Sequence, residues 1–204
     1  MELCSYSKRF NGHNTFICLK YYKSNLYKML IEKDKSSLVI IDVQEKLVAV
    51  MPKPHTFINN IIKLQKAANI FKIPITISEQ YPKGLGKTID KIKAQKYKNI
   101  IEKTNFSITA EGFFYEAEHI VMCGIEAHVC VLQTAIDIVE NDKKKKVYIV
   151  QDAISSRYQN DYLLALSRMD KYHNIEIVSC EMVIFEWLRK SRTEEFKTIS
   201  QIIK

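Results

Sequence analysis

Three residues of this 204-residue chain, Asp42, Lys103 and Cys130, have side chains that could act together in catalysis. Each follows a short apolar segment, and Cys130 stands where a helix is expected to begin. A thiol in the first turn of a helix lies near the positive end of the helix dipole and near unpaired N–H groups, which favour the thiolate. A carboxylate could take or hold its proton, a lysine could stabilise negative charge, and backbone N–H groups of the turn could receive an oxyanion.

Each of these residues also has a simpler structural interpretation. Cys130 stands among Val, Leu and Ala, where cysteine commonly fills space in a core. Asp42 could cap the helix that follows it, and Lys103 could be a surface lysine in a loop. His128 is two positions from Cys130, and residues at that spacing on a helix point apart, which argues against a Cys–His pair. Cys123, inside an apolar segment, is expected to be buried packing.

The segments that would position these residues alternate between strand and helix. Six short apolar runs, many of them β-branched, are typical of strands whose two faces are both covered, and amphipathic stretches lie between most of them. We predict an α/β fold with three layers, α/β/α, around a doubly wound, six-stranded, mainly parallel sheet. The predicted strands are 37–42, 73–78, 98–101, 119–124, 146–152 and 175–179, and the predicted helices are 55–71, 127–142 and 157–174.

Motifs for cofactors and metals are missing. The segment GLGKTI lacks the third glycine of a dinucleotide fingerprint, and the chain has no P-loop, C-x-x-C or H-E-x-x-H motif. Five cysteines form an odd set without framework spacing, which indicates reduced thiols and a cytoplasmic protein. No apolar run reaches the roughly 20 residues of a membrane helix, so we expect no membrane partner.

The net charge of +8 is concentrated rather than spread along a binding stripe. Residues 1–28 contain five basic residues against one acidic residue, and a second basic block is the run 143–146. This distribution does not favour a nucleic-acid partner. We interpret residues 1–28 as a basic N-terminal extension, disordered or, as the alternative, a mitochondrial targeting segment, and residues 29–204 as one folded domain.

Several segments in one collinear order across residues 36–204 resemble the isochorismatase-like cysteine hydrolase superfamily. LVIIDVQEKL is similar to the first strand with its aspartate, EKTNFS to the lysine segment, CGIEAHVCV to the nucleophile turn and DAISSR to the fifth strand. ISEQYPKGLG, CGIEAHVCVLQTAIDI and the tail EEFKTISQIIK are most similar to the isochorismatase domain-containing proteins.

The resemblance implies a catalytic role for Cys130 as nucleophile, Asp42 as base and Lys103 as the stabilising cation. It also implies a non-proline cis peptide between Ile125 and Glu126, with the backbone N–H groups of Glu126 and Cys130 as the oxyanion hole. The expected activity is metal-independent hydrolysis of a small amide or enol-ether-like substrate. The alternative is a catalytically idle interaction or regulatory protein that keeps the fold.

The resemblance also bears on substrate contacts, metals and assembly. The loop EQYPKGLG would line the pocket, so Gln44, Gln80 and Tyr81 are candidate substrate contacts. The metal-binding members have further histidines, whereas only His55 lies between Asp42 and Lys103 here, so we predict no metal. A homo-oligomer is expected, and an exposed apolar C-terminal helix over residues 185–196 could mediate it.

Overall fold

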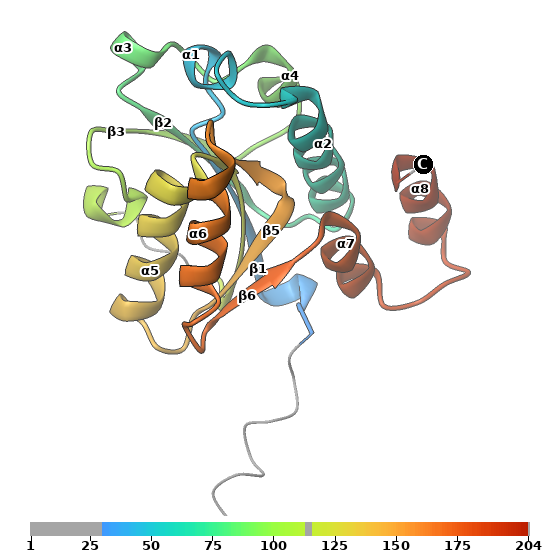
Figure 1. Cartoon of the computed structure of the whole chain (residues 1–204). Coiled ribbons are helices and arrows are strands. Elements are labelled where there is room, and N and C mark those ends of the chain that lie inside the picture. The colour runs from blue at the N-terminus through green and yellow to red at the C-terminus, as the bar shows by residue number, and fades with distance from the viewer. Residues whose placement is uncertain (1–29, 113–115, 204) are drawn as a thin grey trace, which may run out of the picture. The chain divides into compact units, whose positions relative to one another are not determined.

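The sheet is the centre of the described structure. The computed structural model describes residues 30–112 and 116–203, and Ile31–Lys204 forms one compact unit (Figure 1). The predicted extension over residues 1–28 lies outside the described residues. The strands are β1 (Ser36–Ile41), β2 (Ile75–Gln80), β3 (Asn99–Lys103), β4 (His119–Ile125), β5 (Lys146–Ser155) and β6 (Ile175–Val178).

All neighbouring strands pair in parallel, in the order β3-β2-β1-β4-β5-β6. Every residue of β1, β2 and β4 is buried, as expected for strands covered on both faces. The six-stranded parallel sheet is therefore confirmed. The chain runs outward from β1 to β3 and then returns to place β4 beside β1, so the order reverses between these two strands. In open α/β sheets, ligands bind at such a reversal, beyond the carboxyl ends of the strands.

Helices cover both faces of the sheet, which confirms the three-layer prediction. On one side lie α2 (Pro54–Ile70), α7 (Cys180–Leu188) and α8 (Glu194–Ile203), and on the other lie α5 (Leu132–Asn141) and α6 (Gln159–Met169) (Figure 1). Alternate residues of β1 enter the two cores: Leu38 and Ile40 pack toward α2, whereas Val39 and Ile41 pack toward α5. The sheet thus separates two hydrophobic cores.

Short elements complete the connections. They are the helices α1 (Glu45–Val48), α3 (Pro82–Leu85) and α4 (Asp90–Lys93), the 3₁₀ turns η2 (Lys33–Lys35) and η3 (Ile108–Glu111), and the π-helical turn η4 (Ala127–Val131). Within the described part of the chain, no helix has both the length and the apolar character needed to cross a bilayer.

Two expectations at the carboxyl-terminal half are wrong. β5 does not end at Asp152 but continues to Ser155. The exposed helix predicted over residues 185–196 is also absent, because α7 ends at Leu188 and Arg189 turns the chain with a φ of 64°. Trp187 is only 1% exposed and donates a hydrogen bond from Nε1 to Ser36 Oγ (3.0 Å). The side of α7 that carries Trp187 therefore packs in the core.

Candidate active site

Asp42 and Lys103 meet at the carboxyl edge of the sheet. Asp42 directly follows β1, and Lys103 is the last residue of β3, two strands away. The lysine side chain passes the end of the intervening β2, where Gln80 is its register partner. Lys103 Nζ lies 2.7 Å from Asp42 Oδ2, and both side chains are fully buried. A buried ion pair of this kind depends on further hydrogen bonds to offset the loss of solvation.

Those further hydrogen bonds surround the Lys103 ammonium. Besides Asp42, it donates to Gln80 Oε1 (2.6 Å) and to the backbone oxygens of Phe106 (3.0 Å) and Asn105 (3.3 Å). Four acceptors thus surround a group that has three N–H donors. The arrangement holds the cation in place beside the Asp42 carboxylate.

Ser78 holds the other oxygen of that carboxylate. Its buried Oγ donates a 2.6 Å hydrogen bond to Asp42 Oδ1, so both carboxylate oxygens are engaged. The sequence reasoning missed Ser78. Residues two positions apart on a strand share a face, so the polar residues Thr76, Ser78 and Gln80 on one face of β2 were the available signal.

Cys130 lies at the same edge, in the π-helical turn η4 that follows β4. Its side chain is 5% exposed, and Sγ is 4.0 Å from Gln80 Oε1, the oxygen that also binds Lys103. Burial raises the pKa of the Cys130 thiol well above its usual value, Asp42 raises it further, and Lys103 opposes these effects. The resting group is therefore a thiol, which differs from the thiolate expected at a helix start, because burial and the neighbouring carboxylate dominate.

Gly124 allows β4 to approach β1 closely enough to bring these residues together. It has a φ of 115°, and a Cβ at this position would lie 2.1 Å from the backbone oxygen of Ile41. Only glycine fits such an approach. The next peptide bond, between Ile125 and Glu126, is cis, as the resemblance implied.

The turn between Gly124 and Cys130 presents backbone donors. The Glu126 carbonyl accepts from the N–H groups of Val129 (3.1 Å) and Val131 (3.2 Å). The N–H groups of Glu126 and Cys130 belong to this same turn. The Glu126 carboxylate accepts from Arg157 N (3.0 Å) and is thereby held by the segment after β5.

His128 is engaged away from Cys130. Its Nδ1 lies 3.0 Å from Ser156 Oγ, and its Nε2 lies 3.8 Å from Asp161 Oδ2. These partners occupy both ring nitrogens. The sequence argument against a Cys–His pair agrees with this geometry.

The three candidate substrate contacts lie in different surroundings. Gln80 is part of the buried cluster, and its Nε2 donates to Thr104 O (2.7 Å). Gln44 is fully buried; its Oε1 accepts from Gln80 N (2.7 Å), and its Nε2 donates to the oxygens of Gln80 (3.0 Å) and Gly86 (2.6 Å). Tyr81 is 55% exposed and has a φ of 37°. The structure therefore brings Gln80 to the site, places Gln44 behind it and leaves Tyr81 at the surface.

A metal site has no counterpart in the geometry of residues 30–112 and 116–203. In these ranges, no three His, Cys, Asp or Glu side chains are grouped so that they could hold a metal ion. The charged groups among the three predicted catalytic residues are the Asp42 carboxylate and the Lys103 ammonium.

The six-stranded parallel sheet with helices on both faces defines an α/β protein, and sequence comparison identifies its family. The isochorismatase domain matches residues 36–181. Isochorismatase family protein 1B of Dictyostelium discoideum is 35% identical over 185 residues, covering 85% of this chain and 88% of the relative. Isochorismatase domain-containing protein 2 of Danio rerio is 33% identical, with 82% and 86% covered. The chain belongs to the isochorismatase family, in the branch of the isochorismatase domain-containing proteins.

Solved structures share this fold. The MAR1 ribonuclease of Caenorhabditis elegans superposes with a TM-score of 0.79 at 33% identity, covering 85% of this chain and 92% of that one. The YcaC gene product of Escherichia coli, described as an octameric hydrolase of unknown specificity, superposes with a TM-score of 0.75 at 20% identity, covering 86% and 91%. Membership of the family supports a hydrolase-type function.

Proposed function

We propose that the chain is a metal-independent cysteine hydrolase in which Cys130 is the nucleophile, Asp42 the base and Lys103 the electrostatic partner. The observation that carries this proposal is the convergence of a nearly buried thiol on a fully buried ion pair. Gln80 Oε1 links them, at 2.6 Å from Lys103 Nζ and 4.0 Å from Cys130 Sγ. A buried charge pair is a poor source of net stability even when further hydrogen bonds satisfy it, which favours a chemical role for this one.

The proposed reaction begins with a neutral thiol. As Sγ attacks the carbonyl carbon of a small amide, the thiol proton passes to Asp42, and the electron pair of the C=O bond moves to oxygen. Asp42 then returns the proton to the leaving nitrogen as the C–N bond breaks, which leaves a thioester on Cys130. Water gives one proton to Asp42 as it attacks the thioester. The carbon–sulfur bond then breaks to release the acid, and Asp42 returns the proton to Sγ, which restores the thiol.

Two features stabilise charge in this scheme. The developing oxyanion is assigned to the backbone N–H groups of Glu126 and Cys130, which belong to the turn that carries the nucleophile. Lys103 compensates the negative charge as it moves between Asp42 and Sγ. Gln80 is assigned as a contact that positions Lys103, and Tyr81 as a contact at the rim.

The experiment compares Cys130→Ala with Cys180→Ala as a matched control. Cys180 is also a buried thiol, but its Sγ contacts Asn60 O (3.5 Å) on the α2 side of the sheet. Both proteins are tested against small amides and vinyl ethers, with iodoacetamide labelling of Cys130 followed by mass spectrometry. We expect Cys130→Ala to lose at least about a thousandfold in kcat/KM and Cys180→Ala to stay within about tenfold of wild type. Unchanged turnover in Cys130→Ala on every responsive substrate would refute the proposal.

The alternative is an idle site in a regulatory protein, and one observation favours it. Both Asp42 oxygens are engaged, and burial keeps the Cys130 thiol protonated, which is a stable resting arrangement. Absence of turnover, together with labelling of Cys130 no faster than free cysteine, would support this alternative.

RNA belongs in the substrate panel because the C. elegans relative is named a ribonuclease. We predict no RNA cleavage, since the cluster suits attack on a carbonyl carbon.

We also propose that the chain self-associates, as the E. coli YcaC product does. The continuous helix predicted over residues 185–196 is absent, because α7 ends at Leu188 and α8 begins at Glu194. The exposed apolar residues of the α6 region, Leu163, Leu164 (68% exposed) and Tyr158, are the replacement candidate surface. Light scattering after size exclusion should show an oligomer that Leu164→Glu weakens, and a monomeric wild type would refute the assignment.

A further inference from the structure

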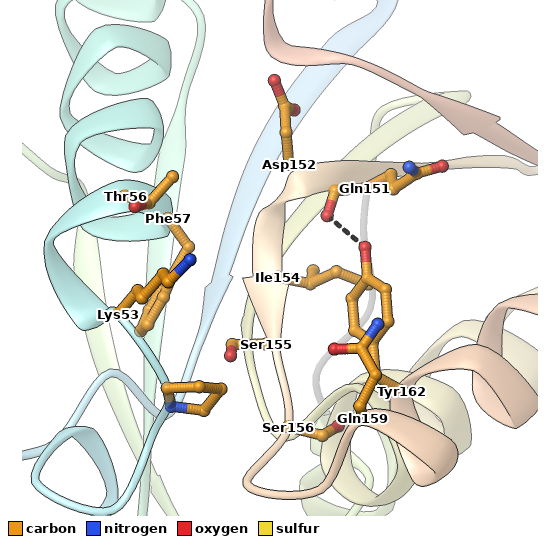
Figure 2. A pocket seen from close by; sticks show the side chains of 11 residues that line it. Lys53, Thr56, Phe57, Gln151, Asp152, Ile154, Ser155, Ser156, Gln159 and Tyr162 are labelled. Atoms are coloured by element: carbon orange, nitrogen blue, oxygen red, sulfur yellow. Dashed lines mark hydrogen bonds between the residues drawn. The ribbon is translucent and has the colours of Figure 1, made fainter.

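A cavity lies at the carboxyl edge of the sheet, between the first turn of α2, the end of β5 and α6 (Figure 2). Its volume is about 400 Å³, within the range of small-molecule sites. The buried residues Phe57, Ile154, Ser155 and Ser156 belong to its lining, and most of the other lining residues are exposed. Asp42, Lys103 and Cys130 are not among the described residues that line it, so it is separate from the proposed catalytic cluster.

Ser155 presents an unused hydroxyl to this cavity. The residue is 7% exposed, and its Oγ has no hydrogen-bond partner in the part of the chain that the structure describes. Figure 2 shows this hydroxyl in the space between β5 and the start of α2. The neighbouring hydroxyls are occupied: Ser156 Oγ lies 3.0 Å from His128 Nδ1, and Tyr162 donates to Gln151 O (2.8 Å). The Ser155 hydroxyl is not among the fully buried unpartnered atoms of the described residues, so it is reachable from the cavity and is free to donate to a ligand there.

The opposite wall of the cavity is positively polarised. α2 is a 17-residue helix whose first turn has no side-chain cap, and Pro54 stands at its start. The exposed N-cap residue, Lys53, has no carboxylate within 4.0 Å among the described residues. A helix N-terminus and an adjacent ammonium group together favour an anion.

Asp152 is the one acidic residue in the lining, and it does not neutralise this wall. Its Oδ1 accepts a 2.8 Å hydrogen bond from Cys180 N, at the N-terminus of α7. In Figure 2 its carboxylate points away from Lys53 and Ser155. The α7 terminus therefore compensates the acidic charge, and the positive wall remains available to an anionic ligand.

We propose that this cavity binds a small phosphate-bearing molecule. The phosphate lies at the N-terminus of α2 and accepts hydrogen bonds from Lys53 and from Ser155. The organic part lies against Phe57 and the Tyr162 ring, which supply apolar surface. The chemistry fits because phosphate oxygens are acceptors only, and because the cavity exceeds the size of phosphate alone.

The test uses isothermal titration calorimetry of the full chain with phenyl phosphate, which joins a phosphate to an aromatic body. Inorganic phosphate and phenol report the two parts separately. We expect saturable binding of phenyl phosphate, weaker binding of inorganic phosphate and no binding of phenol. Ser155→Ala should weaken the Kd at least about tenfold, and Lys53→Met, at an exposed position, about fivefold. Lys66→Met, an exposed lysine of the same helix outside the cavity, should stay within about twofold of wild type.

Cys130→Ala separates this proposal from the catalytic one. Unchanged affinity in that variant supports an independent site, whereas loss of binding would place the ligand at the catalytic cluster and overturn the inference. The inference also fails if phenyl phosphate does not saturate below about 10 mM, or if Lys53→Met and Lys66→Met bind equally. If urea unfolding shows that Ser155→Ala is badly destabilised, the affinity of Lys53→Met relative to Lys66→Met decides the outcome.

Discussion

The buried Asp42–Lys103 pair allows a sharp prediction for the Lys103→Met variant. The side chains are fully buried and their charged atoms are 2.7 Å apart. Methionine is nearly as long but has no ammonium, so Asp42 keeps the hydrogen bond from Ser78 Oγ and loses the one from Lys103, and Gln80 Oε1 also loses Lys103 as a donor. Breaking a buried pair on one side costs about 3–5 kcal/mol, a large part of the roughly 5–15 kcal/mol that stabilises a typical domain.

A double variant separates the effect of the unpaired charge from the effect of lost packing. In Asp42→Asn/Lys103→Met both charges are gone, so the protein should be more stable than Lys103→Met alone by about 1–3 kcal/mol. The matched control is the surface pair Lys143–Glu140, which has the same 2.7 Å separation but side chains that are 67% and 54% exposed. Lys143→Met should change the free energy of unfolding by less than about 1 kcal/mol.

Urea unfolding measures these differences, with Trp187 as reporter because it is the only tryptophan and is buried in the core. With an m-value of about 2 kcal/mol/M, Lys103→Met should lower the midpoint by about 2 M. Equal midpoints for Lys103→Met and Lys143→Met would refute the reasoning. So would a double variant that is no more stable than Lys103→Met.

Three further predictions concern other parts of the site. Gly124→Ala should cost about 3 kcal/mol or more and at least about a hundredfold in kcat/KM, because the new Cβ would force β4 away from β1; wild-type kinetics and urea midpoint would contradict this. Ser78→Ala should lower kcat/KM about tenfold by releasing Asp42 Oδ1, and should do so with a stability loss of about 1–3 kcal/mol; an unchanged kcat/KM would exclude the positioning role. Burial raises the pKa of Cys130, and raises that of Cys180 to about 12, so both thiols stay protonated in the folded protein at pH values where they ionise in the unfolded chain. This contribution to the free energy of unfolding is present below about pH 8.5 and is lost as the pH rises, by about 1–2 kcal/mol per thiol at pH 10. The urea midpoint should therefore fall between about pH 8 and 10. It should fall less in the Cys130→Ala/Cys180→Ala double variant.

The positions of the strands were predictable because their residues are apolar on both faces, as in strands that are covered on both sides. Apolar runs such as 37–42 and 119–124 have no polar side, so they had to lie inside a covered parallel sheet. The ends of elements were less predictable. β5 extends past Asp152 because its hydrogen-bonded pairing with β4 continues through Ile154 and Ser155, and strand pairing is not visible in local composition.

The sequence by itself determined the architecture and nominated Asp42, Lys103 and Cys130, because these residues stand beside segments whose carboxyl ends share one edge of a parallel sheet. Only the tertiary structure decided how they are connected. Strand order places Ser78 and Gln80, both on β2, between Asp42 and Lys103, and this contact depends on neighbours far apart in the chain. The tertiary structure also decided the protonation of the Cys130 thiol: the local sequence places it at a helix start, but the surrounding burial and the nearby carboxylate set the cost of its charge.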